Sequence, residues 1–80
     1  MKKKVLSTLI EKRYIYAFAA AYAAAHKDRE GEGKCREAIR AIEEIASVVG
    51  LKENTDYEVY KTTKTVSGAE VTFFAWKAMT

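Results

Sequence analysis

The chain contains no proline and only one cysteine among its 80 residues. Without proline, it offers no proline-rich segment of the kind that docks into aromatic grooves. Cys35 has no second cysteine with which to form a disulfide or a cysteine metal cluster. We therefore expect a reducing compartment and a cytoplasmic localisation.

Long hydrophobic runs are also absent. The longest stretch without a charged side chain covers residues 14–25 and reads YIYAFAAAYAAA, well short of the roughly 20 residues that cross a bilayer. The basic start of the chain and Ala21-Tyr22-Ala23 superficially resemble a signal peptide, but Glu11, Lys12 and Arg13 interrupt its apolar part. We expect this segment to be part of the fold and predict no membrane association.

The excess of positive charge is small and local. The net charge is +3, and residues 1–13 hold five basic residues against one acidic residue. The rest of the chain has nine basic and ten acidic residues and is close to neutral. A broad basic footprint for nucleic acid is therefore not evident.

Side chains that could perform catalysis are scarce. His26 and Cys35 are the one possible base and nucleophile pair, and Cys35 falls on the apolar side of a predicted helix, where a thiol is unreactive. Glu43 and Glu44 point about 100° apart on a helix and do not converge. Residues 29–34 hold two glycines and a lysine but lack the ending of a phosphate-binding loop. We predict no enzyme activity, no cofactor and no metal site.

Two helices are predicted in the first half of the chain. Thr8 and Glu11 have the spacing of a capping box, so the first helix should begin near residue 8 and end near residues 27–30, with Gly31 and Gly33 as stop signals. Residues 34–49 repeat apolar side chains every three or four positions and predict an amphipathic helix. Gly50 should end it, with Leu51 making the apolar contact of that cap. A short link makes the helices antiparallel.

The second half of the chain predicts a β-hairpin. Two runs rich in Val, Thr, Tyr and Phe, residues 57–66 and 69–78, flank Ser67-Gly68. A two-residue turn there pairs Val66 with Ala69 and, further along, Val59 with Trp76. The expected fold is a single α+β domain, residues 1–80, with two antiparallel helices packed on the hairpin in the order α-α-β-β.

The first predicted helix is apolar on every side. A helical wheel assigns a core face to Ile10, Tyr14, Phe18 and Tyr22, with Ile15, Ala21 and Ala25 beside it. The far side then has no cover from the chain itself, and we predict that it is an oligomer interface formed by Leu9, Tyr16, Ala20 and Ala23. The alternatives are a foreign partner on this side or an ordinary alanine-rich solvent face.

The predicted hairpin also has apolar side chains on both faces. Either a second chain pairs with its edge to give a four-stranded sheet, or its twist carries Trp76 under the end of a helix. For contact with a partner protein, we expect the anchors to be Tyr60, Lys61, Phe74 and Trp76.

Together these patterns predict a small non-catalytic binding protein that acts by stoichiometric protein–protein contact and forms a homo-oligomer. Its size suits an inhibitor or accessory factor of the kind that phages and mobile elements carry, which is an argument from fold alone. The alternative is nucleic-acid binding, in which aromatic side chains of the hairpin stack on bases and lysines of the hairpin and the basic N-terminus contact phosphates.

Overall fold

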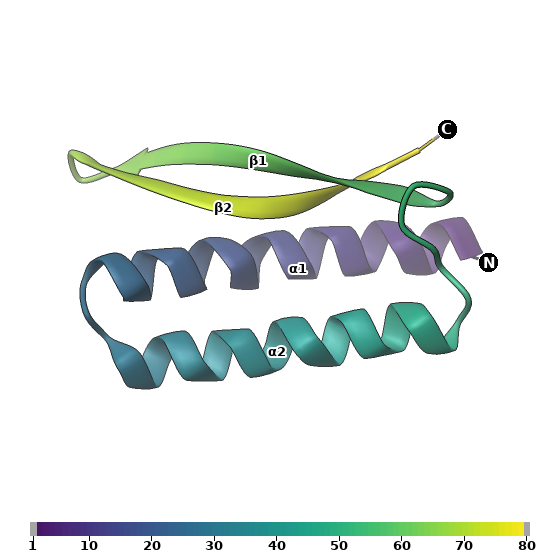
Figure 1. Cartoon of the computed structure of the whole chain (residues 1–80), viewed down its shortest axis with the longest axis horizontal. Helices are drawn as coiled ribbons and strands as arrows, with labels where there is room; N and C mark the ends of the chain where they lie inside the picture. The colour runs from purple at the N-terminus through teal and green to yellow at the C-terminus, as the bar shows by residue number, and fades with distance from the viewer. Residues whose placement is uncertain (1, 80) are drawn as a thin grey trace.

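The computed structural model describes residues 2–79 and contains two helices followed by an antiparallel hairpin. Helix α1 spans Lys2–Ala25, α2 spans Arg29–Val48, β1 spans Tyr57–Val66 and β2 spans Ala69–Ala78. The predicted α+β class and the α-α-β-β order are therefore confirmed. Figure 1 shows the hairpin along one side of α1 and α2 along the opposite side, so α1 is the middle of three layers.

The central position of α1 explains why its sequence is apolar all round. Its backbone packs against both α2 and β2, whereas in the described residues the backbone of α2 does not approach the hairpin. Leu9, Ala20 and Ala23 are buried within this one chain. The expectation that these three side chains lack cover from the chain itself is therefore wrong, and Leu9 lies in a cluster with Ile42 and Ala46 of α2. Tyr16 remains 39% exposed.

Helix α1 begins earlier than expected. The chain is already helical at Lys2, and the Thr8 hydroxyl donates to the Lys4 carbonyl, one turn back, at 3.1 Å. The predicted capping box at Thr8 and Glu11 is therefore wrong. Burial of Leu6 against the core extends the helix toward the N-terminus, because packing outweighs the weak local start signal.

The link between the helices, residues 26–28, lies earlier in the chain than predicted. Helix α1 ends at Ala25, Lys27 has a positive φ of 57°, and Asp28 caps α2 by accepting from the Gly31 N–H at 3.0 Å. Gly31 and Gly33 lie inside the first turns of α2 rather than ending α1. An aspartate cap satisfies a free N–H of the first helical turn, so α2 can begin at Arg29.

The end of α2 follows the prediction. Gly50 has φ +84°, the Gly50 N–H donates to the Ser47 carbonyl at 3.1 Å, and the Leu51 N–H donates to the Ala46 carbonyl at 2.9 Å. This pair of bonds is a Schellman motif. Leu51 packs in the core with Ala46, as expected for the apolar contact of that cap.

The hairpin has the predicted strands and the predicted register. Val66 pairs with Ala69, and Val59 pairs with Trp76. Ser67 and Gly68 both have positive φ, 52° and 82°, which is the type I′ turn that matches the twist of the strands.

Both faces of the hairpin contribute to the core, but at different places. Val71, Phe73 and Ala75 pack on the C-terminal half of α1, beside Ala17 and Phe18. Near the open end of the hairpin, Tyr57 and Trp76 come from the opposite face and join a second cluster with Leu6, Leu9, Ile42, Ala46 and Leu51. The strand twist thus carries Trp76 under the helices, which is one of the two alternatives that the sequence allowed.

Candidate interaction surfaces

The four residues predicted to anchor a partner do not share one surface. Lys61 and Phe74 are a cross-strand pair on the outer face of the hairpin, where Phe74 is 56% exposed. Tyr60 lies on the opposite face and is 39% exposed. Trp76 is only 5% exposed, so the expectation that it is free for a partner is wrong. It packs in the core of its own chain.

Arg13 joins α1, α2 and β2, and the sequence did not single it out. The residue is 8% exposed and its guanidinium lies 5.0 Å from the centre of the Trp76 ring. Its Nη1 donates to the Phe74 carbonyl at 2.9 Å, and its Nε and Nη2 donate to Glu43 Oε2 at 3.3 and 3.2 Å. These contacts satisfy the buried charge and hold β2 at a fixed height along α1.

Tyr57 stacks on the Trp76 ring with 3.9 Å between the ring centroids. Burial raises the pKa of the Tyr57 phenol, and the nearby carboxylates of Glu53 and Glu43 raise it further. The phenol is therefore neutral at physiological pH, and this part of the core carries the positive charge of Arg13 without a second buried charge on tyrosine.

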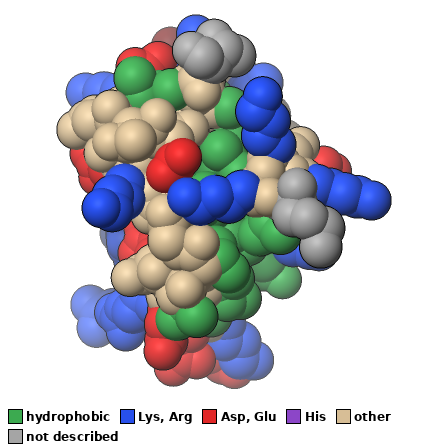
Figure 2. Space-filling model, turned by 90° about the vertical axis from the view of Figure 1, so that its right-hand side faces the viewer, with side chains coloured by type: hydrophobic (Ala, Val, Ile, Leu, Met, Phe, Trp, Pro, Cys, Tyr) green, Lys and Arg blue, Asp and Glu red, His purple; other side chains and the backbone are tan. Residues whose placement is uncertain are grey.

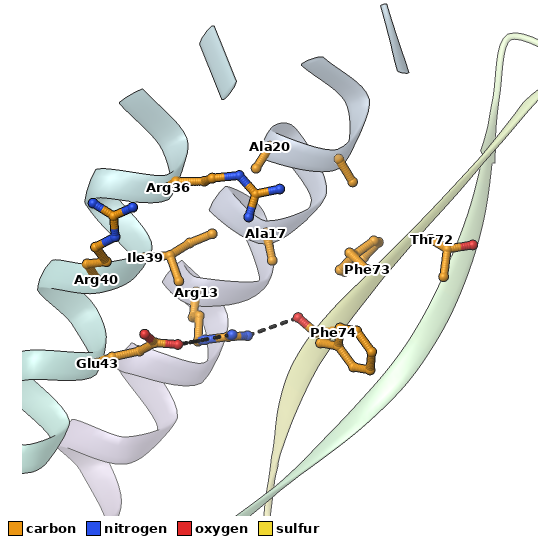
Figure 3. A pocket seen from close by; sticks show the side chains of 11 residues that line it. Arg13, Ala17, Ala20, Arg36, Ile39, Arg40, Glu43, Thr72, Phe73 and Phe74 are labelled. Atoms are coloured by element: carbon orange, nitrogen blue, oxygen red, sulfur yellow. Dashed lines mark hydrogen bonds and ion pairs between the residues drawn. The ribbon is translucent and has the colours of Figure 1, made fainter. Parts of the chain in front are cut away.

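A groove runs between α2 and β2 (Figure 3). Its volume is about 480 Å³, and alanines of α1, including Ala17, Ala20 and Ala21, form its floor. One wall is α2, from which Arg36 extends across the groove toward α1. The small alanine side chains leave this space open, because larger side chains on the same flank of α1 would fill it.

The opposite wall of the groove is mainly the backbone of β2. Phe73 points toward the helices, whereas the side chains of Thr72 and Phe74 point away from them (Figure 3). In an antiparallel hairpin, every second residue of a strand directs both its N–H and its C=O away from the other strand. In β2 these residues include Thr72 and Phe74, whose backbone groups therefore point away from β1. Among residues 2–79, the Phe74 carbonyl is the one backbone acceptor on this edge of β2 that has a hydrogen-bond partner. Its partner is Arg13.

The other side of the α1–α2 layer is an apolar surface, which we call the helical face. On a wheel of 100° per residue, Ile15 of α1 and Ile45 of α2 point opposite the groove-lining positions of their helices, whereas Val5 and Tyr16 point roughly at right angles to those of α1. Its large side chains are 37–80% exposed, with Val48 the most exposed. They are Val5, Ile15 and Tyr16 from α1 and Ile45 and Val48 from α2.

The helical face contains a hollow and a protruding side chain. A hollow of about 320 Å³ lies on α1 and is lined by Lys4, Val5, Thr8 and Leu9. Val48 protrudes from α2, 80% exposed, at a similar height along the helices. The Arg13–Glu43 ion pair fixes how the two antiparallel helices are aligned along their axes. Because residue 13 is level with residue 43, Val48 is level with α1 residues near position 8.

A third surface lies at the end of the molecule that is far from the hairpin turn. A hollow of about 460 Å³ there has Leu6, Ile10 and Tyr60 in its lining, and Lys3 and Lys77 flank it. Figure 2 shows this end, with hydrophobic side chains exposed between lysine and arginine side chains. Of the predicted anchors, Tyr60 and Trp76 line this hollow.

Residues with catalytic or ligand-binding chemistry stay apart. His26 is exposed, stacks on Tyr22 and shares a hydrogen bond with the Tyr22 carbonyl at 2.9 Å, while Cys35 lies partly buried on α2. Residues 2–79 contain no group of three or more His, Cys, Asp or Glu side chains placed to hold a metal ion. None of the helices in this range is both long and apolar enough to span a membrane.

No protein-family model, curated protein or solved structure matches this chain.

Proposed function

We propose that this chain is a non-catalytic binding protein that acts by stoichiometric contact with other protein chains and that forms a homodimer. The observation that carries this proposal is the helical face. Val48 is 80% exposed and Ile15 is 56% exposed on a surface built by two long helices. Large apolar side chains exposed together on a protein surface commonly mark a protein–protein interface.

The features of the helical face favour a second copy of the chain as its occupant. A two-fold axis parallel to the helices would place α1 of one chain against α2 of the other, at the same height. Val48 of each chain would then enter the hollow beside Val5 of its partner. Lys12 of one chain would likewise approach Glu44 of the other, because both are next to the Arg13–Glu43 pair. The result would be a four-helix bundle with a hairpin on each outer side.

The area available is sufficient for such a dimer. A standard interface buries roughly 800 Å² per partner, about one seventh of the 5747 Å² surface of this chain. The two helices, with 24 and 20 residues, are long enough to supply it.

Nucleic-acid binding is supported less well. Tyr60 and Phe74 lie on opposite faces of the hairpin, and Trp76 is buried, so the aromatic side chains form no single stacking surface. Lys64 lies 5.9 Å from the centre of the Tyr14 ring and covers the chain's own core. We therefore favour an inhibitor or accessory protein, which acts by occupying a protein surface, over a nucleic-acid-binding protein.

Light scattering coupled to size-exclusion chromatography tests the proposal directly. The dimer should give twice the chain mass of 9.0 kDa at micromolar concentration. A mass of one chain that persists at high micromolar concentration would contradict self-association through the helical face.

A further inference from the structure

We propose that the groove between α2 and β2 binds an extended, acidic segment of a partner protein, which adds as a strand to the free edge of β2. The inference deepens the stoichiometric binding function and does not require the homodimer, since the groove and the helical face have no lining residue in common.

The backbone of β2 provides the first part of this argument. Thr72 and Phe74 line the groove although their side chains point away from it, so the main chain is what faces the open space. An edge strand with free N–H and C=O groups is a template for another strand, and several peptide-binding domains use such an edge.

The floor of the groove explains why β2 is preferred over β1. A strand placed beside β2 would lie over Ala17, Ala20 and Ala21, which are small enough to let a backbone approach. The free edge of β1 has no such support, because the backbone of α1 approaches β2 and not β1. β1 also carries Lys61 and Lys64, and lysines on an edge strand discourage pairing.

Charge around the groove indicates the character of the partner. Three arginines line it, Arg13, Arg36 and Arg40, against one glutamate, Glu43. Arg13 is occupied by Glu43 and Phe74. Arg36, whose side chain is 56% exposed, donates to the partly buried Glu32 through Nε and Nη2 at 2.9 and 2.8 Å, and a ligand carboxylate can share its guanidinium. An acidic side chain on the added strand would meet Arg36 on α2.

The architecture as a whole supports the same occupant. The backbone of the two-stranded sheet approaches α1 alone, and Ile39 on the groove side of α2 is only partly buried. A third strand beside β2 would fill the groove and cover this side of α2.

A matched pair of proline variants tests the proposal. Thr72 and Thr63 face each other in the hairpin, and their hydroxyl oxygens are 3.0 Å apart. Both backbone N–H groups point out of the ladder, Thr72 toward the groove and Thr63 toward the opposite edge. Proline is tolerated at such edge positions, so Thr72→Pro and Thr63→Pro should perturb the hairpin equally while removing donors from different edges.

The probe is a displayed library of random short linear peptides selected against the immobilised full chain. We expect the selected peptides to be rich in Asp or Glu and in β-branched residues. A synthetic copy of one should bind Thr72→Pro at least about tenfold more weakly than the native chain and bind Thr63→Pro within about twofold. Arg36→Glu should weaken it similarly, while Lys34→Glu, which removes the comparable Lys34–Glu30 pair away from the groove, should not.

Several results would overturn the proposal. The first is a library that yields no peptide preferring the native chain over Thr72→Pro. The second is that the selected peptides are basic. The third is that Thr72→Pro and Thr63→Pro weaken peptide binding equally. If Thr72→Pro converts a dimer into a monomer, the edge is occupied by a second copy rather than by a foreign segment. A strict monomer that still selects acidic peptides would contradict the homodimer and leave the groove proposal intact.

Discussion

At the scale of single residues, Arg13 fixes how three elements meet. It contacts Glu43 on α2, the Phe74 carbonyl on β2 and the ring of Trp76. Nothing in the local sequence separates Arg13 from Lys12 beside it, since both end a basic segment. Its burial depends on partners 30 and 61 residues away, so a wheel of α1 could not have found it.

Replacement of Arg13 should reveal this role. Arg13→Met keeps the helix and most of the side-chain volume but leaves the Phe74 carbonyl and the Glu43 carboxylate without their donor. We expect a loss of about 2–3 kcal/mol in the free energy of unfolding, measured by urea denaturation. The control Arg40→Met changes an exposed arginine of α2 and should alter stability by less than about 0.5 kcal/mol. Equal effects of the two substitutions would show that the buried contacts of Arg13 contribute little.

At the scale of elements, the sequence predicted the parts whose signals are local. The Ser67-Gly68 turn sets the register of the whole hairpin, and Gly50 with Leu51 sets the end of α2. The link between the helices was predicted less well. Two glycines, Gly31 and Gly33, resembled a helix stop, but the Asp28 cap precedes them and α2 runs through both. A glycine ends a helix only where the chain adopts positive φ, which residue type alone does not determine.

Two glycine-to-alanine substitutions should therefore act in opposite directions. Gly50 has φ +84°, so Gly50→Ala should cost about 1–2 kcal/mol of stability through backbone strain. Gly33 lies within α2, and a Cβ added there meets no atom within 4 Å. Gly33→Ala should stabilise the fold by about 0.5–1 kcal/mol, because alanine favours the helix. Urea midpoints of both variants test this, and a destabilising Gly33→Ala would mean that α2 does not begin before Gly33.

At the scale of the whole molecule, the order of the layers decides which apolar side chains stay exposed. An evenly apolar helix has no preferred buried side, so the wheel of α1 could not predict that α2 and the hairpin would cover two different sides of it. This is why Leu9, Ala20 and Ala23 proved to be buried, while Tyr16 stayed at the surface. The large apolar side chains that do stay exposed on the helices come from both α1 and α2, and they include Ile15 and Val48.

The most direct test of dimerisation through the helical face is the mass in solution of two variants in which equally exposed apolar residues are replaced by glutamate. Ile15 on the helical face and Phe74 on the outer face of the hairpin are both 56% exposed, so glutamate at either position should be tolerated by the monomer. Light scattering should give two chains for the native protein and for Phe74→Glu, and one chain for Ile15→Glu, because a charge in the apolar interface cannot be solvated. A dimer that survives Ile15→Glu and dissociates with Phe74→Glu would contradict the account and move the interface to the hairpin.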